Sequence, residues 1–173
     1  MDIKVVLLLI CSVSIFEKVN GFEFFECPSG PKYKITKFGP DQTCYYFEAD
    51  KKSFAQAQNN CATKFRTYEG KLAEPQTAER STLLNKYAQE ILNNQNNYWI
   101  GYDDLGHGTG NFRYSSTNGV SSIIGKGYDT IDGNNDEHCA GFFYAPSYGN
   151  FYGDVDDMKC EREFSSICEI QKS

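Results

Sequence analysis

Residues 153–169, GDVDDMKCEREFSSICE, hold the features around which the rest of the chain is organised. Two neighbouring carboxylates, Asp156 and Asp157, stand just before Cys160, and a second cysteine, Cys168, follows near the end of the chain. Adjacent side chains of an extended strand point to opposite faces, so both carboxylates can reach one ion only where the strand bends or where one residue contributes its backbone carbonyl. The pattern indicates a hard cation bound at the end of a strand.

The first 21 residues are typical of a secretory signal. Lys4 supplies a positive start, residues 5–15 are apolar, and Gly21 places a small residue before the predicted cleavage site. The apolar run is too short to span a bilayer, although an uncleaved anchor is the alternative. We expect the mature chain, residues 22–173, to be secreted and not inserted in a membrane.

Charge and cysteine content narrow the class of protein. A net charge of -6 argues against nucleic acid and anionic membranes as partners and suits cations or neutral ligands. The six cysteines that remain after the signal are Cys27, Cys44, Cys61, Cys139, Cys160 and Cys168. An even count in a secreted chain predicts three disulfides, whose pairing the spacing alone does not choose. A metal–thiolate site is the competing interpretation, but no Cys-x-x-Cys pair is present.

Two helices are expected in the first half of the mature chain. Ser53 can cap a first helix whose inner face carries Phe54, Ala57 and Cys61 at helical spacing. A second helix is expected to start near Thr77 and to run to about Leu92. Its predicted buried face comprises Leu83, Leu84, Tyr87, Ala88 and Ile91.

Short strands and long loops are expected elsewhere, which gives an α+β layout in a single domain. Residues 22–47 read as a hairpin, and residues 98–102, YWIGY, as a buried strand. Further candidate strands are residues 112–114, 140–144 and 166–169. Long loops in a domain of this size usually carry function.

Taken together, these residues resemble the C-type lectin-like domain family over almost all of the mature sequence. The resemblance rests on Cys61 in the first helix, Leu72 before the second, WIG at residues 99–101, Cys139 with Cys160, and ICE at residues 167–169, several of them in the family's order. It implies the long form of the fold, with two helices, antiparallel sheets, an N-terminal hairpin and a long loop region. It also implies the disulfides Cys27–Cys44, Cys61–Cys168 and Cys139–Cys160.

The resemblance implies calcium as a cofactor and a carbohydrate or glycoconjugate as the partner. In such lectins one Ca2+ in the long loop region coordinates two neighbouring sugar hydroxyls. Because Ca2+ takes several oxygen ligands, a protein that supplies only part of the shell leaves positions for those hydroxyls. We therefore expect a secreted lectin, with roles such as innate recognition or agglutination, and homo-oligomer formation is left open.

The family's metal ligands can be carried over to only part of this sequence. Its Trp-Asn-Asp element falls on residues 155–157, which assigns Asp156 and Asp157 as ligands, and its acid two residues before a conserved cysteine falls on Glu137. For this acidic turn the alternative is a solvated loop before a disulfide. Glu137 and Asp156 are also expected to contact the sugar.

The family's remaining element, Glu-Pro-Asn or Gln-Pro-Asp, is absent. An ungapped comparison places residues 129–131, DTI, at that position, whereas a shortened loop places Asp132 and Asn134 there. We prefer Asp132 and Asn134, as ligands of both metal and sugar, because they keep the spacing of an acid and an amide. Turn chemistry explains these residues equally well. The sugar preference does not follow from this motif.

Aromatic residues between Cys139 and Cys160 offer a stacking surface for a sugar. Tyr144 and Tyr152 are our candidates, and either ring could cover the apolar face of a sugar. Turn and core packing is the alternative explanation for both side chains.

A second class of function remains in view because part of the family's motif is missing. The chain could be a protein-, mineral- or ice-associated module of lectin-like fold, or could bind sugar without calcium. An enzyme is not expected, since no set of nucleophile, base and orienting group is visible. The paired carboxylates Asp103 and Asp104 do not establish a glycosidase site, and His107 and His138 are expected to be bystanders.

Overall fold

The structure, a computed structural model, describes Cys27 and residues 34–36, 43–91, 96–121, 136–144 and 155–171. Its strands are β1 (Lys34–Thr36), β2 (Thr43–Lys52), β3 (Lys71–Leu72), β4 (Tyr98–Asp103), β5 (Arg113–Tyr114), β6 (Cys139–Phe142), β7 (Val155–Met158) and β8 (Phe164–Gln171). Its helices are α1 (Phe54–Lys64), the 3-10 turn η1 (Arg66–Tyr68), α2 (Ala78–Lys86) and the π-helical turn η2 (Tyr87–Ile91). The α+β prediction is confirmed.

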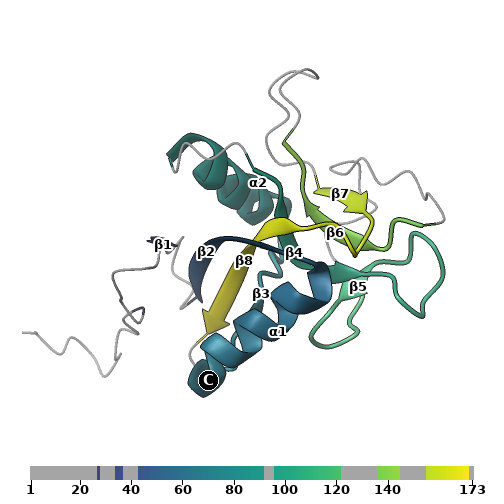
Figure 1. Cartoon of the computed structure of the whole chain (residues 1–173), viewed down its shortest axis with the longest axis horizontal. Coiled ribbons are helices and arrows are strands. Elements are labelled where there is room, and N and C mark those ends of the chain that lie inside the picture. The colour runs from purple at the N-terminus through teal and green to yellow at the C-terminus, as the bar shows by residue number, and fades with distance from the viewer. Residues whose placement is uncertain are drawn as a thin grey trace, which may run out of the picture.

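The strands of the described ranges form one sheet in the order β1-β2-β8-β4-β6-β7, with β3 added to β8 and β5 to β4. β4 and β8 run parallel, and the other pairs are antiparallel. β1 and β2 pair as the predicted N-terminal hairpin. The disulfide Cys27–Cys44 connects the residues before β1 to the start of β2. β8 lies at the centre because the last strand of the chain pairs with both β2 and β4. Figure 1 shows α1 and α2 on either side of this central group.

The sheet separates two apolar clusters, and one helix covers each of them. On β2, Tyr45 and Phe47 belong to the cluster that contains Leu84 and Ala88 of α2 and its extension. Their neighbours Cys44 and Tyr46 belong to the cluster that contains Phe54, Ala57 and Cys61 of α1. This alternation follows from the two-residue period of a strand, because both faces of the sheet are covered.

The first helix begins where the sequence predicted. Ser53 is its N-cap and donates its backbone N–H to Gln56 Oε1 at 3.2 Å, which is the reciprocal contact of a capping box. Phe54, Ala57 and Cys61 are its buried residues, as expected. The disulfide Cys61–Cys168 then ties this helix to β8.

The second helix differs from the prediction at one position and at its end. Thr77 caps it by accepting the backbone N–H of Arg80 at 3.2 Å, and Leu84 is fully buried. Leu83, which we placed on the buried face, is 46 % exposed. A helix turns by about 100° per residue, so adjacent residues share a buried face only when that face is broad, and α2 is positioned over the sheet with Leu84 inside and Leu83 outside. The helix changes to the π-helical turn at Tyr87, and Leu92 lies outside the described residues.

Buried polar contacts complete the core. Trp99 is fully buried, as expected; it packs edge-on against Phe54 and donates from Nε1 to the backbone oxygen of Lys52 at 2.9 Å. Tyr102 donates its hydroxyl to the backbone oxygen of Pro75 at 2.5 Å. These bonds satisfy the polar atoms of large side chains that would otherwise oppose burial.

A buried cluster of charges joins β3, β8 and the turn after β5. Glu74 and Glu169 are 3 % and 1 % exposed, and Lys71 Nζ lies 2.5 Å from Glu74 Oε2 and 3.3 Å from Glu169 Oε1. Glu74 donates its backbone N–H to Glu169 Oε2 at 3.0 Å. Ser116 donates its backbone N–H (2.9 Å) and its hydroxyl (2.8 Å) to Glu74. Two buried acids thus share one base.

The environment of this cluster shifts the pKa values of Glu169 and Lys71. Burial raises the pKa of Glu169, although the nearby charge of Lys71 opposes this shift. Burial acts to lower the pKa of Lys71, but its hydrogen bond to Glu74 and the charges of Glu169 and Glu74 outweigh it, so the pKa is raised.

All three disulfides that the resemblance implied are present: Cys27–Cys44, Cys61–Cys168 and Cys139–Cys160. In the described part of the chain no helix is long and apolar enough to cross a membrane. The predicted signal, residues 1–21, lies outside the described residues.

Candidate functional site

The candidate site is built on the antiparallel pair β6 and β7. Cys139 is paired with Met158, Ala140 with Asp157, and Gly141 with Asp156, without a break in register. The disulfide Cys139–Cys160 joins the start of β6 to the residues after β7. This end of the sheet is therefore held both by backbone hydrogen bonds and by a covalent bond.

The two adjacent aspartates occupy consecutive positions of β7, and their environments differ. Asp157 is 3 % exposed and is paired with Ala140, which belongs to the cluster beneath α2. Asp156 is half-buried. Since consecutive side chains of a strand point to opposite faces, the two carboxylates do not converge on one point through their side chains.

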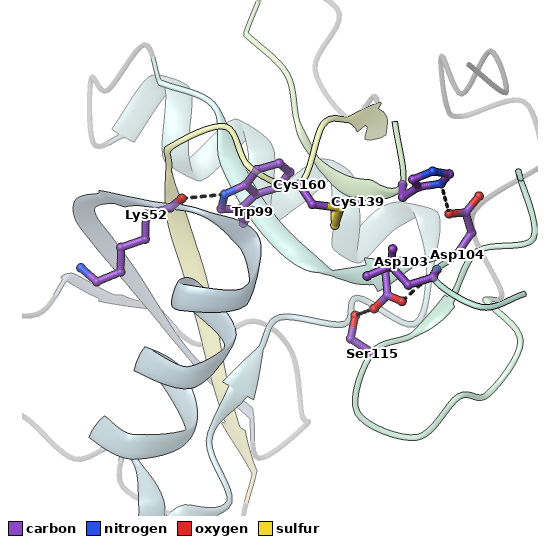
Figure 2. Close-up of a disulfide and its surroundings, with 9 residues drawn as sticks. Lys52, Trp99, Asp103, Asp104, Ser115, Cys139 and Cys160 are labelled. Carbon is purple, nitrogen blue, oxygen red and sulfur yellow. Dashed lines mark hydrogen bonds and ion pairs between the residues drawn. A yellow bond between two sulfur atoms is a disulfide. The ribbon is translucent and has the colours of Figure 1, made fainter. Parts of the chain in front are cut away.

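Asp104, directly after β4, is a centre of hydrogen bonds (Figure 2). Its side chain is fully buried, and its Oδ1 lies 2.8 Å from Nδ1 of His138. Its Oδ2 accepts the backbone N–H of Gly110 at 2.6 Å. Its own N–H donates to the backbone oxygen of His138 at 3.1 Å, and its backbone oxygen accepts from His107 at 2.9 Å. Asp104 thus connects the loop after β4 to the residue that precedes β6.

Asp103 makes a separate set of contacts. Its Oδ2 accepts the hydroxyl of Ser115 at 2.5 Å, and its Oδ1 accepts the backbone N–H of Leu105 at 3.2 Å. Figure 2 shows the carboxylates of Asp103 and Asp104 directed away from each other. Only that of Asp104 is directed toward the start of β6.

Glu137 lies between two residues that are themselves held in place. Asp136 pairs with Lys159, which follows β7, and His138 is bonded to Asp104. The hydrogen bond from Lys159 lowers the pKa of Asp136, and that bond together with the charges of Asp136 and Glu137 raises the pKa of Lys159. The positive charge of Lys159 therefore also acts on the predicted ligand Glu137.

The structure covers part of the predicted ligand set. Glu137, two residues before β6, and Asp156, on β7 opposite Gly141, are half-buried carboxylates, and their oxygen atoms suit Ca2+ by donor type. No group of three or more His, Cys, Asp or Glu residues in the described ranges is arranged to hold a metal ion. Asp132 and Asn134 lie outside these ranges, so a complete calcium shell depends on them and stays a prediction.

Of the two tyrosines predicted to stack on a sugar, the structure describes only Tyr144. Tyr144 is half-buried just beyond β6, and its backbone N–H donates to Asn97 Oδ1 at 2.8 Å. Tyr152 lies outside the described residues. A stacking role for either ring stays a prediction.

Sequence reasoning missed the contacts of Asp104 and His138. We expected His138 to be a bystander, yet its ring and its backbone oxygen both bond to Asp104. The sequence signal was a carboxylate directly after a buried strand and a histidine directly before a cysteine. These two residues lie 34 positions apart, and only the pairing of β4 with β6 brings them together.

Comparison with known proteins agrees with this fold. The family model described as "Lectin C-type domain" matches residues 50–170. Comparison with curated proteins gave no match. Among solved structures, human lithostathine is similar, with a TM-score of 0.64 and 21% sequence identity over 85% of this chain and 92% of that chain.

Two further solved structures, a carbohydrate-recognition domain and an antifreeze protein, show the same fold. The carbohydrate-recognition domain of the mouse scavenger receptor C-type lectin has a TM-score of 0.60 and 22% identity over 85% of this chain and 98% of that chain. A calcium-independent type II antifreeze protein has a TM-score of 0.62 and 20% identity over 84% of this chain and 95% of that chain. The family and its structural neighbours are lectin-like binding modules. Because the family model spans well over half of the sequence, the chain belongs to the C-type lectin domain family.

Proposed function

We propose that the protein is a secreted lectin that binds carbohydrate hydroxyls through a calcium ion. The observation that carries this proposal is a pair of half-buried carboxylates on the strand pair that Cys139–Cys160 joins, in a chain of the C-type lectin family. Glu137 stands two residues before β6, and Asp156 lies on β7 opposite Gly141. Asp157, Asp132 and Asn134 complete the proposed set of ligands.

In the proposed site, some residues of this chain would hold the calcium ion and others would orient the sugar. A bound Ca2+ would supply open coordination positions for neighbouring sugar hydroxyls. The carboxylates of Glu137 and Asp156 would accept hydrogen bonds from those hydroxyls, whereas the amide of Asn134 could also donate. Tyr144 or Tyr152 would cover an apolar face of the sugar.

The test is retention on a glycan array with CaCl2 and with EDTA. We expect binding in calcium, release by EDTA, and loss of binding in Glu137→Gln and Asp156→Asn. Both residues are half-buried, so these changes should disturb the core less than a change at the buried Asp157. Glu161→Gln is the matched control, because Glu161 is an exposed acid just after Cys160. Binding that is unchanged in both site variants would refute the ligand assignment.

A second candidate is a lectin-like module that needs no calcium. The position of Lys159 favours it, because the charge of its ammonium group interacts with Glu137 and competes with a metal ion for that carboxylate. One structural neighbour is a calcium-independent type II antifreeze protein. Retention that survives EDTA would support calcium-independent sugar binding, and the absence of any glycan ligand would favour a protein-, mineral- or ice-associated module.

A further inference from the structure

Asp104 uses all of its polar groups to join two segments that are distant in sequence. Its N–H and its Oδ1 both bond to His138, at 3.1 Å to the backbone oxygen and 2.8 Å to Nδ1. Its Oδ2 and its backbone oxygen bond to Gly110 and His107 in the loop after β4. The side chain is fully buried, so these bonds are shielded from competing water.

This arrangement fixes His138 at two points. The backbone bond sets the position of its carbonyl, and the ring bond sets the direction of its side chain. Because both the backbone and the ring of His138 are held, the backbone of the preceding residue, Glu137, is also restricted. On the other side of Glu137, Asp136 is paired with Lys159. One residue beyond His138, Cys139 is bound to Cys160.

We propose that Asp104 is a positioning residue for the ligand site, because it holds residues 136–139 through His138 and so directs the carboxylate of Glu137. The inference deepens the proposed function and rests on it for the role of Glu137. Residues that orient a metal-binding side chain without touching the metal typically lower metal affinity by about 10-fold to 100-fold when they are replaced.

The donor geometry of His138 offers a sharp test. A carboxylate oxygen only accepts, so Nδ1 of His138 carries the hydrogen of this bond. In His138→Asn, the side-chain amide nitrogen occupies nearly the position of Nδ1 and keeps the donor. In His138→Ala the donor is lost. Asp104 now accepts hydrogen bonds from Gly110 N–H and from His138 Nδ1. In Asp104→Asn, the side-chain NH2 group would face one of these two donors, so that hydrogen bond would be lost.

Asp103→Asn is the matched control. Asp103 precedes Asp104, carries the same side chain and accepts two hydrogen bonds, but neither comes from His138. Asp103→Asn measures the effect of the same substitution at the end of β4 without touching His138. Because Asp104 is the more deeply buried of the two aspartates, the return of calcium binding in His138→Asn relative to His138→Ala is what separates a positioning role from a general loss of stability.

The experiment titrates Ca2+ against the full chain and its four variants by calorimetry, and measures hydrogen exchange at the amide of residue 104 without calcium. We expect Asp104→Asn and His138→Ala to weaken calcium binding by about 10-fold or more and to speed exchange. His138→Asn and Asp103→Asn should remain within a few-fold of the original protein in both measurements.

Two outcomes would overturn the inference. One is equal weakening in Asp103→Asn and Asp104→Asn, which indicates a general effect. The other is failure of His138→Asn to restore what His138→Ala loses. If no protein binds calcium, the proposed calcium site fails, and hydrogen exchange alone decides whether Asp104 holds residues 136–139. Unchanged exchange in Asp104→Asn and His138→Ala would then reject it.

Discussion

Replacing Lys71 by methionine would remove the one base shared by two buried acids. Lys71 Nζ lies 2.5 Å from Glu74 and 3.3 Å from Glu169, and both acids are almost fully buried. Methionine keeps most of the length and apolar character of the lysine side chain. The change therefore isolates the loss of the positive charge and of its hydrogen bonds.

The expected cost follows from the burial of the partners. Removing one member of a buried ion pair typically costs about 3 to 5 kcal/mol, because the remaining charge is left without compensation. The side chain of Lys71 is 30% exposed, so water screens part of the interaction. We expect Lys71→Met to lower the free energy of unfolding by about 2 to 3 kcal/mol near pH 8.

The pH dependence provides a second signature. Burial raises the pKa of Glu169 in the folded protein, and loss of the Lys71 charge, which opposes this shift, should raise it further. A folded-state pKa above the unfolded value means that the folded state binds the proton more tightly, so stability falls as pH rises through the interval between the two. The cost of Lys71→Met should thus be largest at pH 8 and smaller near pH 5.

Urea unfolding at pH 5, 6.5 and 8, followed by the fluorescence of the single buried tryptophan, Trp99, would measure these differences. Lys159→Met is the matched control, since it breaks an exposed pair with Asp136 and should change stability little at any of the three pH values. A cost for Lys71→Met that is absent at pH 8, or equal at pH 5 and pH 8, would refute this account.

Three further predictions concern the core. Replacing Cys61 and Cys168 together by alanine removes a link across 107 positions, and calorimetry should show a loss of about 4 to 5 kcal/mol. Leu84→Ala should cost about 2 to 5 kcal/mol in urea unfolding, whereas Leu83→Ala, at 46 % exposure, should change stability by about 0.5 kcal/mol or less. Burial raises the pKa of Tyr98 from 10.0 to about 12, so this group alone should lower stability by about 1.4 kcal/mol per pH unit between pH 10 and pH 12, and urea unfolding of the protein and of Tyr98→Phe across this range, followed by circular dichroism, would measure its share. Equal effects of Leu83→Ala and Leu84→Ala, or the same loss of stability above pH 10 in the protein and in Tyr98→Phe, would contradict the burial on which these values rest.

Local signals in the sequence predicted the frame of the fold well. The cap at Ser53 and the helical spacing of Phe54, Ala57 and Cys61 depend only on neighbouring residues, and α1 matches them. The strand around Trp99 was equally clear, because an apolar run between polar loops has few alternatives. The disulfide pairing came from the family resemblance, since six cysteines do not choose their partners by spacing.

Contacts between distant segments were not predictable in the same way. Helical spacing allowed Leu83 and Leu84 on one broad face, and only the position of α2 over the sheet decides between them. Lys71, Glu74 and Glu169 looked like separate charges in the sequence, although β3 pairs with β8 and brings two of them together. Propensity and periodicity describe each element alone, whereas these pairs depend on how the elements meet.

The adjacent aspartates of β7 show how the structure sharpens the site. The sequence left two routes by which Asp156 and Asp157 could reach one ion, a bend in the strand or a contribution from a backbone carbonyl. Four consecutive pairs connect β6 and β7 without a register shift, so β7 is regular where both aspartates lie. In a regular strand their side chains point to opposite faces. Within the proposed site, a backbone carbonyl of this strand is therefore the route that remains, and the half-buried Asp156 is better placed than the buried Asp157 to offer its carboxylate.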